Sequence, residues 1–128
     1  MKRTLIVGLL VSSVLLVTGV ARAQDPAKVG PNIYTVKLEN DRVRVSEIRF
    51  KPGDSIPMHE HSDHFVYVLT AGTLQLSYPD GRTSELVGVP GQVAWIPAES
   101  HAAVNTGSSE FAAVVVELKP LPAYSDTK

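Results

Sequence analysis

Short runs of β-branched and aromatic residues, separated by turn residues, follow one another along most of this chain. Val43–Phe50 and Phe111–Leu118 are the longest of these runs, and between residues 74 and 78 apolar and polar side chains alternate. Such alternation is typical of a strand with one buried face. No segment repeats apolar residues at the helical spacing i, i+3, i+4 and i+7 over a useful length. The pattern predicts an all-β domain, either an antiparallel sandwich or a barrel.

Further strands are expected between the turns. The turns are marked by Lys51-Pro52-Gly53-Asp54, Pro79-Asp80-Gly81 and Val89-Pro90-Gly91. Gly81 is the residue that can take a positive φ in a hairpin turn. The remaining predicted strands cover residues 33–38, 65–69, 84–87, 93–96 and 102–104.

The first 23 residues have the pattern of a secretory signal peptide. Lys2 and Arg3 precede a short apolar run over residues 5–20, and Ala21-Arg22-Ala23 matches an A-x-A cleavage site. A spanning helix needs about 20 predominantly apolar residues, so a stable membrane anchor is the weaker interpretation. We therefore expect cleavage before Gln24 and a secreted or periplasmic mature protein.

Cleavage would leave 105 of the 128 residues, which is enough for one domain and too few for two. We expect a flexible mature N-terminus over residues 24–32, the domain over 33–119 and a disordered tail over 120–128. The chain has no cysteine, which excludes a disulfide scaffold, an iron–sulfur cluster and a thiolate zinc site. Its formal net charge of −1 provides no basic footprint for a nucleic acid.

The chain has four histidines, and three of them, His59, His61 and His64, lie within six residues. On a strand, His59 and His61 would face the same side, because side chains alternate with a period of two. Neutral imidazole is the commonest metal ligand among side chains. With His101, the cluster therefore predicts a metal site, and the alternative is a metal-free pocket lined by histidines.

Two stretches around these histidines resemble the two motifs of the cupin superfamily. The first contains Gly53, His59, His61 and Gly72, and the second contains Gly91, Pro97, His101 and Asn105, all in the family's order and at about its spacing. The resemblance covers about residues 43–118. It implies a double-stranded β-helix, which is the jelly-roll form of the predicted sandwich.

The sequence departs from the family at two points. The family's glutamate ligand is absent, and alignment on Tyr67-Val68-Leu69 places His64 at its position. Glu99 stands where the family has glycine, and His101 comes one residue early. The resemblance then implies four ligands around one divalent metal: His59, His61, His64 and His101. An uncharged all-histidine set favours Fe, Zn, Cu or Ni over Mn or Mg.

Five more residues are candidates for the pocket or for contacts behind the ligands. Asp63 could hold a ligand imidazole, and Glu99 could do the same or act as a general base, although both could also be solvated acids. Trp95 could line the pocket or pack in the core or between subunits. We expect Met58 in the core or the pocket wall, and Asn105 in a turn where it satisfies backbone groups.

The resemblance alone does not fix an activity, because the family is functionally broad. One hypothesis is a metal-dependent oxygenase or isomerase that acts on a small organic molecule. The alternatives are a non-catalytic periplasmic protein that binds a small ligand or the metal, and a sensory module with a structural metal. Small members of the family commonly dimerise, so a homodimer is also expected, with residues 111–118 and the N-terminal arm as contacts.

Overall fold

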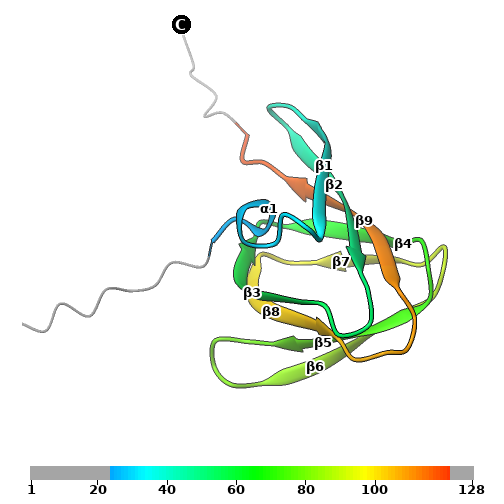
Figure 1. The fold of residues 1–128 in the computed structure, drawn as a ribbon. Coiled ribbons are helices and arrows are strands. Elements are labelled where there is room, and N and C mark those ends of the chain that lie inside the picture. The colour runs from blue at the N-terminus through cyan, green and yellow to red at the C-terminus, as the bar shows by residue number, and fades with distance from the viewer. Residues whose placement is uncertain (1–23, 122–128) are drawn as a thin grey trace, which may run out of the picture.

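The chain folds into two antiparallel sheets that pack face to face and enclose a core (Figure 1). This computed structural model describes residues 24–121. Its elements are α1 (Pro26–Val29), β1 (Tyr34–Glu39), β2 (Val43–Phe50), β3 (Ser55–His61), β4 (His64–Val68), β5 (Gly72–Ser77), β6 (Thr83–Gly88), β7 (Val93–Ile96), β8 (Glu99–Asn105) and β9 (Phe111–Leu118). The predicted all-β jelly-roll architecture is confirmed.

The five-stranded sheet has the order β1-β2-β9-β4-β7, and the four-stranded sheet has the order β3-β8-β5-β6. Strands β2, β7 and β9 have the predicted bounds. The sequence analysis did not name β3, because Pro57 interrupts its strand pattern. The structure accommodates Pro57 at a register shift between Ile56 and His59, a position where a missing backbone donor is tolerated.

Phe50 and Phe111 form the centre of the core. They lie opposite each other on β2 and β9, and each is 1% exposed. Gly72 and Gly88 permit this packing, because a Cβ atom at Gly72 would lie 2.9 Å from the Phe111 Cβ and one at Gly88 would lie 2.6 Å from its Cε2. Glycine is thus required at both positions for close approach, while Gly81 has the predicted positive φ in its turn.

Residues 24–32, predicted to be a flexible terminus, pack against the barrel instead. The Asp25 side chain caps α1 by accepting from Ala27 N and also pairs with Arg44 at 2.9 Å. The Gln24 carbonyl accepts from Glu60 N on β3 at 3.1 Å. These polar contacts and the packing of Ala27 and Val29 against the core hold the segment in the structure, and a four-residue helix leaves no apolar periodicity to read in the sequence.

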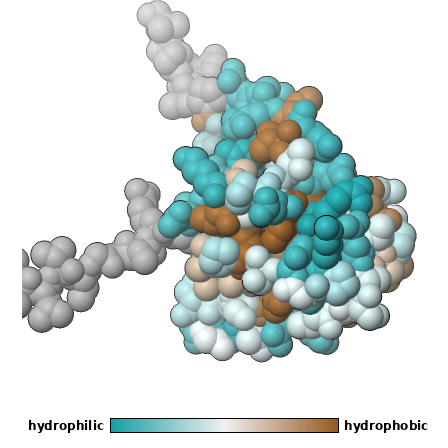
Figure 2. Space-filling model, in the orientation of Figure 1, coloured by the Kyte–Doolittle hydropathy of each residue, from teal (hydrophilic) through white to brown (hydrophobic). Residues whose placement is uncertain are grey.

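The predicted signal peptide, 1–23, and residues 122–128 of the predicted tail lie outside the described residues. Within 24–121, no helix is both long and apolar enough to cross a membrane. In the view of Figure 2, apolar surface gathers beside α1 and the β1–β2 hairpin, and the surface over β5 and β6 is mostly hydrophilic or neutral.

Candidate metal centre

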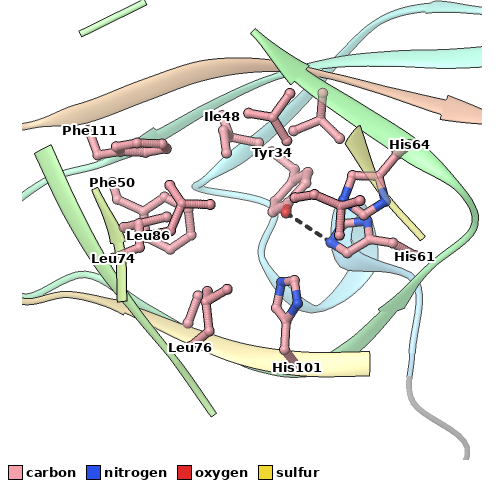
Figure 3. Close-up of a pocket in the computed structure, with 14 residues that line it drawn as sticks. Tyr34, Ile48, Phe50, His61, His64, Leu74, Leu76, Leu86, His101 and Phe111 are labelled. Carbon is pink, nitrogen blue, oxygen red and sulfur yellow. Dashed lines mark hydrogen bonds between the residues drawn. The ribbon is translucent and has the colours of Figure 1, made fainter. Parts of the chain in front are cut away.

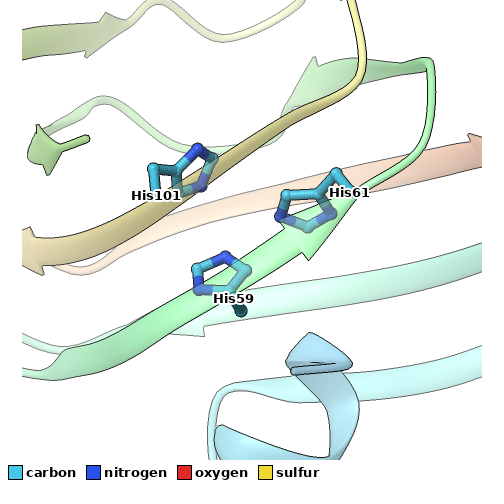
Figure 4. Close-up of side chains that lie close together, drawn as sticks. All are labelled: His59, His61 and His101. Carbon is cyan, nitrogen blue, oxygen red and sulfur yellow. The ribbon is translucent and has the colours of Figure 1, made fainter. Parts of the chain in front are cut away.

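Three buried histidines converge at one end of the barrel (Figure 4). The antiparallel pairing of β3 with β8 places His59 opposite His101, and His61 lies two residues further along β3 on the same face. One ring nitrogen from each of the three lies within 4.8 Å of the others. His59 is fully buried. These three histidines can therefore hold one metal ion.

His64 is brought next to this group from the other sheet. It lies on β4, it is buried, and its ring centroid is 4.6 Å from that of His61. The group of mutually close nitrogens contains His59, His61 and His101 without it. Its predicted place as the fourth ligand, in the position of the family's glutamate, stays a prediction.

All four imidazoles are held by hydrogen bonds from Nδ1 to an oxygen atom. The acceptors are Pro57 O for His59 at 2.8 Å, Glu117 Oε1 for His61 at 2.8 Å, Ser62 O for His64 at 2.8 Å, and Glu99 Oε1 for His101 at 2.7 Å. Carbonyl and carboxylate oxygens only accept, so each Nδ1 must carry the proton. Each Nε2 then has a free lone pair, which is the state in which histidine binds a metal.

The Nε2 atom of His59 gives a direct test of the fit. It is buried and has no hydrogen-bond partner, one of three such side-chain atoms in residues 24–121. A buried polar atom without a partner costs stability and calls for an explanation. A metal ion would satisfy this atom, and neutral nitrogen donors suit a divalent transition metal. The residues present therefore fit such an ion.

Burial also favours the uncharged form of His59, His64 and His101. Desolvation lowers the pKa of His59 to about 4. Desolvation, followed by the charges of His61 and His64, lowers the pKa of His101 to about 4. Desolvation lowers the pKa of His64 as well. A metal that binds at neutral pH thus needs to displace no proton from these rings.

Glu117 is a functional residue that the sequence analysis missed. It projects inward from β9, is 8% exposed, and lies opposite His64 across β4 and β9. Its second oxygen lies 3.8 Å from Arg44 Nη1, so the buried carboxylate has a cation as well as the His61 proton. One sequence feature could have revealed it: an acid at an inward position of an otherwise apolar strand.

Tyr34 was also missed. The sequence predicts the strand that contains it, but nothing in the sequence indicates that this strand lies near the histidines. Its hydroxyl lies 3.4 Å from His61 Nε2, and its ring contacts the edge of His59. His61 Nδ1 carries the proton, so the tyrosine donates this long hydrogen bond. Burial, reinforced by the charge of Glu117, raises the pKa of Tyr34 and keeps the phenol protonated.

A small apolar cavity adjoins the histidines (Figure 3). Tyr34, His61, His64 and His101 line one end, and ten apolar side chains, among them Phe50 and Phe111, line the rest. The space open to the centre of a water-sized sphere is about 40 Å³. A single water needs about 10–15 Å³ by this measure, so the cavity holds only a few atoms beyond a metal ion.

The structure separates the two acids that the sequence singled out. Glu99 holds His101, which is one of the roles predicted for it. Within residues 24–121, Asp63 forms no hydrogen bond to a histidine. Its Oδ1 instead accepts from Ala98 N at 2.8 Å and ties two loops together.

The other three candidates do not line the cavity. Trp95 is 56% exposed, because its partner across β4 and β7 is Phe65 on the outward face. Met58 lies in the irregular stretch of β3 and is only partly buried. A pocket role for either residue gains no support from this cavity and stays a prediction. Asn105 has the predicted turn role, donating to the carbonyls of Phe50 and Ser109.

Comparisons with known proteins agree with the fold. No protein-family model matches the chain. The chain is 39% identical over 90 residues to the beta-alanine degradation protein BauB of Pseudomonas aeruginosa, an alignment that covers 68% of this chain and 93% of that protein. A cupin domain from Bordetella pertussis superimposes with a TM-score of 0.64 at 33% identity, covering 80% of this chain and all of that one.

A third relative is an enzyme by name. The polyketide cyclase RemF from Streptomyces resistomycificus is 31% identical and superimposes with a TM-score of 0.52, covering 70% of this chain and 66% of that one. The sequence motifs, the two-sheet barrel and these relatives agree, and the chain belongs to the cupin superfamily.

Proposed function

We propose that this cupin binds one divalent transition metal and acts on a small organic molecule as a metal-dependent oxygenase or isomerase. The ligands in this proposal are His59, His61, His101 and, as the fourth, His64. The observation that carries it is the common arrangement of the four rings: every Nδ1 is bonded to an oxygen, which leaves every Nε2 without a proton. The Nε2 lone pair of His61 accepts the long bond from Tyr34.

When bound, the metal would supply Lewis acidity or a binding position for oxygen. The chain's own residues supply the rest. Glu117 and Glu99 fix the orientation of His61 and His101, and their negative charges make those imidazoles stronger donors. The wall of the cavity is mostly apolar, and the low polarity around it strengthens polar interactions inside.

The relatives support a small organic substrate. The name of one places it in beta-alanine degradation, and the name of the other describes a cyclase of polyketides. The cavity of about 40 Å³ favours a molecule of a few heavy atoms over a polycyclic one.

Elemental analysis of tag-free protein purified without added metal tests the proposal. Wild type should contain about one equivalent of a transition metal, and His59→Ala should contain none. Glu60→Ala is the matched control, because Glu60 lies between two ligands but faces outward. His64→Ala should also lose metal if His64 is a ligand. No uptake by wild type, even after titration with Fe, Zn, Cu and Ni, would contradict the proposal.

The small cavity also favours a second candidate, a non-catalytic protein that holds the metal. Four histidines could saturate a tetrahedral ion and leave no position for a substrate. Cobalt-loaded protein separates the two functions. A visible spectrum that changes when small anions are added indicates an open position, and one that does not change indicates a saturated site.

We propose that the protein acts after export, because residues 1–23 carry the signal-peptide pattern. The test is the intact mass of the protein from the periplasmic fraction of an expressing bacterium. A mass that corresponds to a chain starting at Gln24 is expected, and an uncleaved chain in the cytoplasm would contradict export.

We also propose a homodimer, formed through the outer face of the five-stranded sheet. Leu38, Val45, Val116, Phe65 and Trp95 lie in register across its strands and are exposed or half-buried. Light scattering should give a dimer for wild type and a monomer for Trp95→Glu; a monomeric wild type would refute this.

A further inference from the structure

The hydroxyl of Tyr34 is the one polar group in the cavity wall that is not an imidazole. The other lining residues are the ten apolar side chains and three histidines. Among residues 24–121, no lysine, arginine or carboxylate lines the cavity. Whatever enters is therefore recognised by the metal centre, by apolar contacts and by this one phenol.

In the structure, the phenol has a single partner among the described residues. Its hydrogen bond goes to His61 Nε2 at 3.4 Å, which is long for this kind of contact. That nitrogen lone pair is the same one that a metal would take. Metal binding and the Tyr34–His61 hydrogen bond are thus mutually exclusive.

A buried hydroxyl that loses its acceptor must find another, because an unsatisfied donor costs free energy. The Nδ1 atoms of His64 and His101 are donors already bonded to oxygens, and their Nε2 lone pairs are the ones that the proposed metal would take. The apolar wall offers no acceptor either. The new acceptor is then a water or an oxygen atom of the molecule that enters the site.

We propose that Tyr34 recognises the substrate: it donates its hydrogen bond to an oxygen atom of a small carboxylate or carbonyl compound that shares the metal. This inference rests on the proposed function. No cationic side chain of residues 24–121 lines the cavity, so only the metal ion can neutralise a negative charge on the ligand. The ligand is therefore neutral or carries no more negative charge than the ion compensates. Its oxygen-bearing end lies at the histidines, and a short apolar remainder faces Phe50 and Phe111.

The test uses full-length mature protein loaded with cobalt and titrated with acetate as the probe. Tyr34→Phe should keep the cobalt content of wild type, because the phenol is not a ligand. Its affinity for acetate, measured from the visible spectrum, should fall about tenfold, as expected for a lost hydrogen bond to a charged acceptor. Tyr78→Phe is the control, because its hydroxyl contacts Ser84 on the exposed side.

The outcomes separate the two proposals. If wild type takes up no cobalt, both the proposed function and this inference fail. If it takes up cobalt and Tyr34→Phe binds acetate as tightly as wild type, or if wild type binds no acetate, only the inference fails. A loss of affinity at unchanged cobalt content supports it.

A measurement on wild type covers the case in which Tyr34→Phe does not fold. In zinc-loaded protein labelled with ¹³C-tyrosine, acetate should shift the Cζ resonance of Tyr34 and leave that of Tyr78 in place. An unshifted Tyr34 resonance at saturating acetate would overturn the inference.

Discussion

The two ends of the barrel interior are built on opposite principles. At one end, Phe50, Phe111 and Leu74 need no partners and are held by shape alone. At the other end, four histidines lie buried. Each needs a hydrogen-bond acceptor for its Nδ1, as Glu117 provides for His61, and a partner for its Nε2. The apolar end is stabilised by burial, whereas the histidine end costs free energy until something binds. The site without a bound ion thus destabilises the barrel locally, and burial of the apolar end compensates for this cost.

The sharpest test of this contrast is His59→Ala. It removes a nitrogen that the structure leaves without a partner. We expect the variant to contain no bound metal. We also expect it to remain folded and to unfold cooperatively in urea. Metal content and urea unfolding, measured on the same preparation, check the two halves. An unfolded His59→Ala would mean that the histidine end supports the fold as well.

Phe111→Ala should have the reverse effect. Its ring packs against Gly72 and Gly88, which have no side chains to fill the gap. We expect a loss of about 3–5 kcal/mol in the free energy of unfolding, with metal content per folded molecule unchanged. Val87→Ala, at an exposed position of β6, is the control and should change stability little. Urea titrations of the three proteins provide the comparison.

Glu117→Gln sharpens the contrast within the histidine end. The amide can still accept from His61 Nδ1 but carries no charge. We expect metal affinity to fall about tenfold, because contacts behind a ligand tune it by 10–100-fold. Competition with a chelator measures the affinity, and Glu60→Gln controls for the loss of one negative charge. Equal affinities for the two variants would show that the charge of Glu117 has no effect on the site.

The pH dependence of the apo-protein tests the histidine end without any substitution. His59 and His101 have pKa values of about 4 in the fold, against an ordinary value of 6.5. Between these values the unfolded chain binds protons that the native state does not. Stability from these groups is therefore complete above pH 6.5 and is lost as the pH falls toward 4. Urea unfolding at pH 7.5, 6 and 5 measures this, and a flat profile would contradict it.

The sequence predicted the parts of the molecule that depend on local pattern. Strands β2 and β9 have the expected bounds, and His59 and His61 share a face because they are two residues apart on a strand. The pattern also placed Trp95 on β7, but alternation alone does not reveal which face of a strand is inside. In the structure, Trp95 pairs with Phe65 on the outward face of the five-stranded sheet.

The residues that the sequence did not predict depend on contacts between distant segments. Glu117 reaches His61 across 56 positions of the chain, and Tyr34 reaches it across 27. Neither distance leaves a local pattern. The same holds for Asp25, whose bond to Arg44 fixes the N-terminal segment to the barrel.

The separation of the histidines along the chain also bears on folding kinetics. His59, His61 and His64 are close neighbours in the unfolded chain, but His101 joins them only after β3 has paired with β8. Such long-range pairing forms slowly. An unfolded chain in excess metal can therefore bind an ion through the three near histidines before the fourth arrives. Refolding should therefore be slower with excess zinc than with a chelator, because the prematurely bound ion must be released or rearranged before β3 can pair with β8. We expect the native metal site to form more efficiently when the metal binds after the barrel has folded.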